Sequence, residues 1–82
     1  MIVEVLFFGA TAEATGERAI EFSLSENVNA DEAFAAILKS FPGLQQNFKN
    51  SLLFAVNQEY SGGDKIIKNG DELAVFTAVS GG

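Results

Sequence analysis

The sequence contains 82 residues, with five Lys and Arg against eleven Asp and Glu, and it has neither His nor Cys. At this length one domain is expected, and 48 % apolar residues supply a core without disulfides. Zinc, haem and iron–sulfur sites are excluded because their Cys and His ligands are missing, and Cys–His and Ser–His catalysis is excluded for the same reason. The net charge of −6 and the scattered cations argue against nucleic acid as a partner. We therefore expect neither a self-contained enzyme nor a metal site.

The N-terminal segment shows no sign of membrane insertion or targeting. The first apolar run is interrupted by Glu4 and ends at Gly9, far short of the roughly 20 residues of a membrane span. No basic region typical of a targeting signal precedes it. We therefore expect a cytoplasmic protein without membrane contact.

Two strands are predicted at the start of the chain. Residues 2–8 are mostly β-branched, aliphatic and aromatic, which is typical of a buried strand. Residues 20–24 alternate apolar with polar side chains, which is typical of a strand with one wet face. The link between them holds at most a short helical turn, too little for a crossover helix, so the two strands are expected to pair antiparallel.

A helix is predicted next, because apolar residues recur at helical spacing from Ala30 to Phe41. Asn29 stands where an N-cap belongs, and Glu32 follows three residues later, as in a capping box. Pro42 and Gly43 are expected to stop the helix. Residues 44–50 are expected to be a connecting segment that its apolar side chains attach to the core.

The remaining third of the chain predicts strands over residues 52–56 and 73–79, with a short strand or bridge over residues 65–68. Asn69-Gly70 is a hairpin-type turn signal. Two strands, one long helix and two or three strands predict an α+β domain of the β-grasp type, with a mixed sheet of four to five strands packed on one main helix. The domain is expected to span residues 1–79, with residues 80–82 as a flexible Ser-Gly-Gly tail.

Candidate reactive groups within this domain are few. The acidic pairs fit helix caps and turns better than a converging catalytic pair. The segment Gly62-Gly63-Asp64-Lys65 lacks the spacing and the following helix of a phosphate-binding loop, so no ATP site is predicted. The chain is therefore expected to bind no cofactor itself.

Two pairs of neighbouring residues predict an apolar patch. Adjacent side chains on a strand point to opposite faces, so if Phe7 faces the helix, Phe8 faces away, and the same holds for Val75 and Phe76. Exposed apolar patches tend to mark partner sites. The alternative, in which the connecting segment covers these side chains, stays open at this point.

The end of the chain is the other candidate. Because glycine has no side chain, Gly81 and Gly82 can thread a narrow channel in another protein. Three residues reach at most ~10 Å, so the nearby body of the domain must dock as well. The ionised terminal carboxylate is a poor electrophile and would need activation, for example as an acyl-adenylate, by another protein. An incidental glycine end is the alternative.

Several segments together resemble one known family over essentially the full length. They are Val5-Leu6-Phe7-Phe8, Glu13 with Gly16, Ala55-Val56-Asn57-Gln58, Gly70-Asp71-Glu72-Leu73, Phe76 and Val79-Ser80-Gly81-Gly82. In these segments and their spacing the chain resembles the small, sulfur-carrying subunit of molybdopterin synthase.

The resemblance implies a ubiquitin-like β-grasp fold and a non-catalytic subunit whose Gly82 passes through an acyl-adenylate to a thiocarboxylate. It implies an E1-like adenylyltransferase that uses ATP, a sulfur donor system, and a large catalytic subunit that builds the dithiolene of molybdopterin within a heterotetramer. By the same resemblance, Ser80 and Gly81 thread the partner's site, and Phe8, Tyr60 and Phe76 contact partners.

The chain departs from the family pattern at two places. Many members have Arg where this chain has Ala12, and Pro-Pro where it has Thr77-Ala78. These departures put one partner salt bridge and the stiffness of the strand end in question. Two other functions stay open: a related ubiquitin-like sulfur carrier (thiamine-type) or protein modifier, and a non-covalent ubiquitin-like interaction domain.

Overall fold

Four strands and three helices make up the described part of the computed structural model, residues 1–48 and 51–78. In chain order the elements are β1 (Ile2–Phe7), α1 (Ala10–Thr15), β2 (Ala19–Ser23), α2 (Ala30–Ser40), α3 (Pro42–Phe48), β3 (Leu52–Val56) and β4 (Glu72–Thr77).

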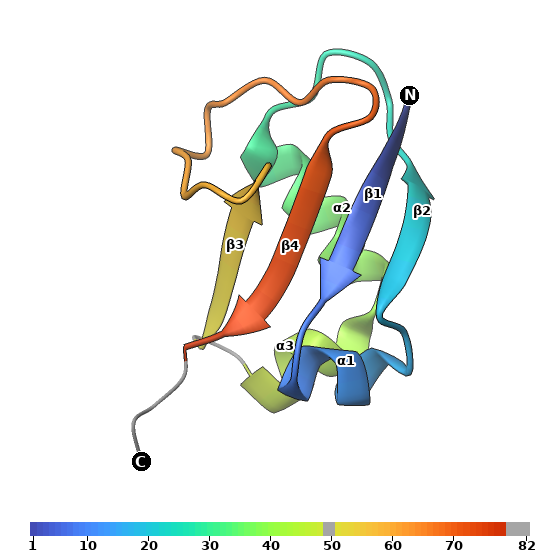
Figure 1. Cartoon of the computed structure of the whole chain (residues 1–82), viewed down its shortest axis with the longest axis vertical. Coiled ribbons are helices and arrows are strands. Elements are labelled where there is room, and N and C mark those ends of the chain that lie inside the picture. The colour runs from blue at the N-terminus through green and yellow to red at the C-terminus, as the bar shows by residue number, and fades with distance from the viewer. Residues whose placement is uncertain (49–50, 79–82) are drawn as a thin grey trace.

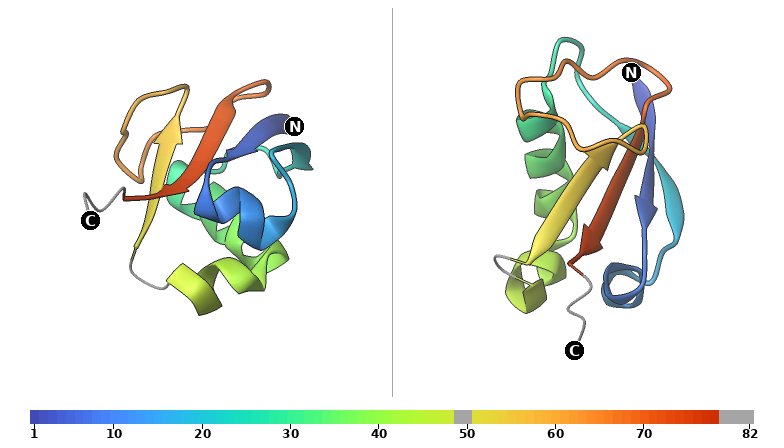
Figure 2. Two further views of the ribbon diagram at one scale, coloured as in Figure 1. Left: turned by 60° about the horizontal axis from the view of Figure 1, so that its bottom comes forward. Right: turned by 60° about the vertical axis from the view of Figure 1, so that its left-hand side comes forward.

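The four strands form one mixed sheet in the order β2-β1-β4-β3. The two central strands, β1 and β4, run parallel, and each pairs antiparallel with its outer neighbour. Helix α2 crosses one face of this sheet, and α1 and α3 lie together at one end (Figures 1 and 2). The predicted α+β β-grasp arrangement is confirmed, with four strands.

The core lies between the sheet and α2. Alternate residues of β1 point toward the helix, and Val3, Val5 and Phe7 are almost fully buried there. They join Phe34 and Ile37 from α2 in one apolar cluster. Burial of each such side chain contributes about 1.5–3 kcal/mol, so this layer supplies most of the stability.

Helix α2 begins as its sequence predicts. The Asn29 side chain accepts a hydrogen bond from the Glu32 backbone N–H at 2.9 Å, and the Glu32 carboxylate accepts one from the Asn29 N–H at 3.0 Å. This capping box is complete. The helix ends at Ser40, and Phe41 is its C-cap with φ −128° and ψ 72°, because a residue before proline is pushed out of the α region.

The segment after α2 corrects the sequence prediction of a connecting segment. Residues Pro42–Phe48 form a further helix, α3, which buries Leu44 completely. Proline stops a helix that it follows, but it is also favoured at the first position of a new one, where its missing N–H needs no partner. The expectation that apolar side chains attach this segment to the core is confirmed, since Phe48 also packs against it.

The segment predicted as a short strand or bridge over residues 65–68 is a bridge. Ile66 forms an isolated antiparallel bridge with Asn29 rather than a strand. Ile67 is buried in the core, whereas Ile66 is exposed. Strand β4 covers Glu72–Thr77, and Val79, which the sequence places in the same strand, lies outside the described residues.

Candidate functional site: the open face of the sheet

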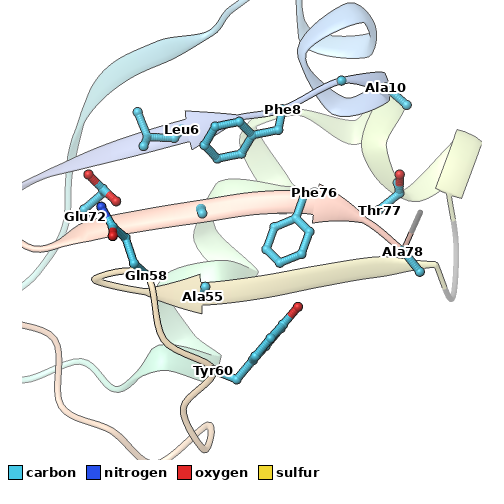
Figure 3. Close-up of a pocket in the computed structure, with 12 residues that line it drawn as sticks. Leu6, Phe8, Ala10, Ala55, Gln58, Tyr60, Glu72, Phe76, Thr77 and Ala78 are labelled. Atoms are coloured by element: carbon cyan, nitrogen blue, oxygen red, sulfur yellow. The ribbon is translucent and has the colours of Figure 1, made fainter.

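The sheet face that α2 does not cover carries an apolar patch. It is formed by even-numbered residues of the two central strands with one residue of β3: Leu6, Phe8, Ala55, Ala74 and Phe76. Figure 3 shows the rings of Phe8 and Phe76 side by side on this face. We call it the open face. Phe8 is 51 % exposed while its neighbour Phe7 is 2 % exposed. The two side chains therefore lie on opposite faces of the sheet, as predicted, and α3 does not cover the patch.

A groove runs along the open face, with Tyr60 at its edge. Tyr60 is exposed, and its ring centroid lies 6.1 Å from that of Phe76. Phe8, Tyr60 and Phe76, which the family resemblance assigns to partner contacts, therefore line one groove, although Phe8 directly follows β1, Tyr60 lies in a loop and Phe76 belongs to β4. Thr77 and Ala78 line its far end.

Thr11 holds Phe8 in place. Its side chain is completely buried, and its hydroxyl donates to the Val75 carbonyl at 2.7 Å and the Phe8 carbonyl at 2.9 Å. The same oxygen accepts a hydrogen bond from the Phe8 N–H at 3.0 Å. One hydroxyl thus joins the end of β1 to β4 behind the open face. The sequence reasoning missed Thr11, because a threonine after a Phe-Gly segment carries no signal of a partner 64 residues away.

The turn at Asn57 and Gln58 aligns the other edge of the groove. Both residues have positive φ, 51° and 68°, and the flanking Val56 and Glu59 exchange backbone hydrogen bonds, which together define a type I′ turn. Asparagine tolerates this left-handed backbone, whereas Gln58 adopts it at a cost in strain. The turn directs the chain back so that Gln58 and Tyr60 both reach the groove.

A hydrogen-bond network fixes this turn to the start of β4. The Asn57 side-chain oxygen accepts from the Glu72 N–H at 2.9 Å, and its amide donates to the Asp71 carboxylate at 3.1 Å. The other Asp71 oxygen accepts from the Lys68 N–H at 2.8 Å. The Val-Asn-Gln and Gly-Asp-Glu segments, singled out separately in the sequence, therefore form one structural unit.

The predicted reactive tail lies outside the described residues. Ser80, Gly81 and Gly82 are all beyond Ala78, where the description of the chain ends. Four residues from Ala78 to Gly82 span at most about 14 Å. Any site that Gly82 enters must therefore lie close to the Thr77 end of the groove.

The remaining acidic residues form no metal site in the described part of the chain, where no three carboxylates come close enough to hold an ion. Glu32 serves as a helix cap, as expected. Within residues 1–48 and 51–78, no helix has the length and apolar character needed to cross a bilayer.

Comparison with known sequences identifies the family. Residues 5–82 match the ThiS family. The chain is 40 % identical over 83 residues to the human molybdopterin synthase sulfur carrier subunit, covering 98 % of this chain and 93 % of the human protein. The chain therefore belongs to the ThiS family, together with the sulfur carrier subunits of molybdopterin synthase. The resemblance seen in its sequence segments is confirmed.

Solved structures of similar proteins share the fold. SAMP1 from Haloferax volcanii superposes with a TM-score of 0.86 at 25 % identity, and the match covers 100 % of both chains. A chain from the complex of subunits 1 and 2 of the molybdopterin-converting factor from Helicobacter pylori superposes with a TM-score of 0.70 at 26 % identity, again over 100 % of both chains.

The two departures from the family pattern have defined positions. Ala12 lies in α1 and packs against the core, while Thr77 ends β4 beside the groove.

Proposed function

We propose that the chain is the sulfur carrier subunit of a molybdopterin synthase, with Gly82 as the carrier. The observation that carries the proposal is the apolar groove of the open face, which ends at Thr77 and Ala78, four residues before a Gly-Gly terminus. Family membership supports the same function.

The chemistry follows from the chain's only candidate reactive group. The Gly82 carboxylate attacks ATP bound by an E1-like adenylyltransferase, and pyrophosphate leaves, which forms the acyl-adenylate. A nucleophile from a sulfur donor system, which carries sulfur at the oxidation level of sulfide, then attacks the carbonyl carbon of Gly82. AMP leaves, so that one carboxylate oxygen has been replaced by sulfur. The thiocarboxylate delivers this sulfur to the molybdopterin precursor in the large catalytic subunit, within a heterotetramer.

The open face would bind these partners. Because the last four residues reach at most about 14 Å, the body must dock whenever Gly82 enters an active site. Aromatic side chains in a groove are typical anchors of protein interfaces. Phe8 and Tyr60 are exposed in this groove, and Phe76 is half-buried there. Ser80 and Gly81 would then thread the channel that leads to the reacting centre, where side chains larger than theirs would obstruct it.

Mass spectrometry tests the proposal directly. The chain is incubated with an E1-like adenylyltransferase, ATP and a sulfur donor, and its intact mass is measured. We expect exchange of one terminal oxygen for one sulfur, and the product should convert precursor to molybdopterin when a large subunit is added. A chain lacking Gly82 should remain unmodified while its melting temperature stays almost unchanged.

Three outcomes would point elsewhere. Absence of sulfur incorporation would favour a non-covalent interaction domain. Sulfur incorporation without molybdopterin formation would favour another sulfur carrier, such as the thiamine type. A covalent adduct with lysine side chains of other proteins would favour a modifier. In each case the proposed function would be wrong.

A further inference from the structure

Three glutamates form a row across the open face. The strand register places Glu4 of β1 opposite Glu21 of β2 on one side and Glu72 of β4 on the other. Glu4 lies two and four residues before Leu6 and Phe8, so strand alternation puts its side chain on the same face as theirs. The open face therefore has an acidic part, Glu4, Glu21 and Glu72, beside its apolar part.

The glutamates in this row occupy directly paired positions of neighbouring strands. Backbone hydrogen bonds join Phe7 to Arg18 and Leu24 to Met1. Hydrogen-bonded and non-hydrogen-bonded pairs alternate along an antiparallel pair of strands, so Glu4 and Glu21 form a non-hydrogen-bonded pair. Side chains approach most closely in such pairs. Like charges directly opposite each other destabilise a sheet. Glu4 and Glu21 thus occupy positions at which like charges are unfavourable.

Nothing in the described residues relieves this repulsion. The three carboxylates take part in no ion pair or side-chain hydrogen bond within residues 1–48 and 51–78, where the ion pair found joins the Met1 amine to Glu26 at 3.1 Å. The carboxylates also do not converge as metal ligands within that part of the chain. Cationic groups of another molecule would relieve it.

The acidic part is continuous with the groove. Glu72 lines the same groove as Leu6 and Phe76, and Figure 3 shows its carboxylate at the end of the face opposite Thr77. The row lies at the first residue of β4 and the third of β1, which runs parallel to it, and the tail follows where β4 ends. The two ends of the open face therefore differ: one end is negatively charged, and the other leads to the proposed reactive terminus.

We infer that the open face docks the large catalytic subunit through a surface with an apolar centre and a cluster of Arg or Lys side chains, and that these cations bind Glu4, Glu21 and Glu72. This inference rests on the proposed function and extends it. A second copy of the chain is a poorer occupant, because it would bring the same net charge of −6. Nucleic acid is excluded by that charge.

The charged contact would decide orientation. A flat apolar patch of Phe8 and Phe76 buries area in many rotations about its normal, whereas paired charges at one end select one rotation. Cations above Glu4 leave the Thr77 end, and hence the tail, over the acceptor's site. The acidic row would act as a positioning element, with no contact to the reacting atoms.

Neutralising variants test the inference by affinity. The triple variant Glu4→Gln, Glu21→Gln, Glu72→Gln removes the row, and the matched control Glu26→Gln, Asp31→Asn, Asp64→Asn removes three charges away from the open face. Binding to the large subunit is measured by calorimetry at about 0.1 M and about 1 M salt, between which the Debye length falls from about 10 Å to about 3 Å.

We expect the row variant to bind about tenfold more weakly at low salt and the difference to vanish at high salt, while the control stays within about twofold. The isolated row variant should melt at the same temperature as the unaltered chain or higher, since repulsion is removed. Equal losses for both variants would reduce the effect to net charge and overturn the inference, as would unchanged binding of the row variant. If the unaltered chain failed to bind any large subunit, the proposed function itself would fall.

Discussion

The two faces of one sheet have opposite roles although the same strands build them. Phe7 and Phe8 are adjacent and chemically identical, but Phe7 packs edge-on against Phe41 with ring centroids 5.2 Å apart, whereas Phe8 stands in the open groove. Val75 and Phe76 divide in the same way. The comparison teaches that strand alternation places one residue of each pair in the core and leaves its neighbour on the open face, where it is available for recognition, and three changes can test this division.

The largest effect on folding is expected at the covered face. Phe7→Ala should lower the free energy of unfolding by about 3–5 kcal/mol, because it leaves a cavity where α2 and the sheet meet. Urea denaturation followed by circular dichroism measures this. A loss below about 1 kcal/mol would mean that the covered face is loosely packed and that the contrast between the faces is wrong.

A smaller loss is expected at the connection between the faces. Thr11→Val keeps the shape of the side chain but removes the hydroxyl shared by Phe8 and Val75, which should cost about 1–3 kcal/mol. Thr15→Val is the matched control, since all hydrogen-bond partners of its hydroxyl are backbone groups within four residues, the carbonyls of Thr11, Ala12 and Glu17 and the N–H of Glu17. Equal losses for the two variants would show that the link between β1 and β4 contributes nothing special.

The smallest effect on folding is expected at the open face. Phe8→Ala should change the free energy of unfolding by less than about 1 kcal/mol, because half of the side chain is already exposed. Its affinity for the large subunit should fall by about 2 kcal/mol or more, about 30-fold in Kd, as for an interface anchor. Calorimetry measures the affinity, and unchanged binding would remove Phe8 from the proposed docking surface.

The elements predicted correctly are those with strong local signals. Helix α2 has a continuous apolar stripe and a capping box between Asn29 and Glu32, both set within a few residues of sequence. The strands follow from β-branched and alternating residues, and the short link between the first two settles their antiparallel pairing. Helix α3 was missed because Pro42, which ends one helix, also begins the next, and its role as a helix stop was the only one considered.

The features of the candidate site also separate into those with a local sequence signal and those that depend on contacts between distant residues. The separation of Phe8 from Phe7 follows from strand alternation, and the Gly-Gly terminus is visible in the sequence itself. The Thr11 bridge, the Asn57–Asp71 network and the glutamate row could not be foreseen, because each joins residues of different elements. Their positions depend on strand register, which a one-residue shift would change completely.

By itself, then, the sequence determined the fold class, the capped helix, the aromatic side chains available for an interface and the absence of Cys, His and a nucleotide-binding motif. Only the tertiary structure decided that Phe8, Tyr60 and Phe76 share one groove, that this groove ends where the chain leads toward Gly82, and that Glu4, Glu21 and Glu72 line up beside it. The physical reason is range: periodicity and capping act over a few residues, whereas a surface is assembled by strand pairing between residues nearly 70 positions apart.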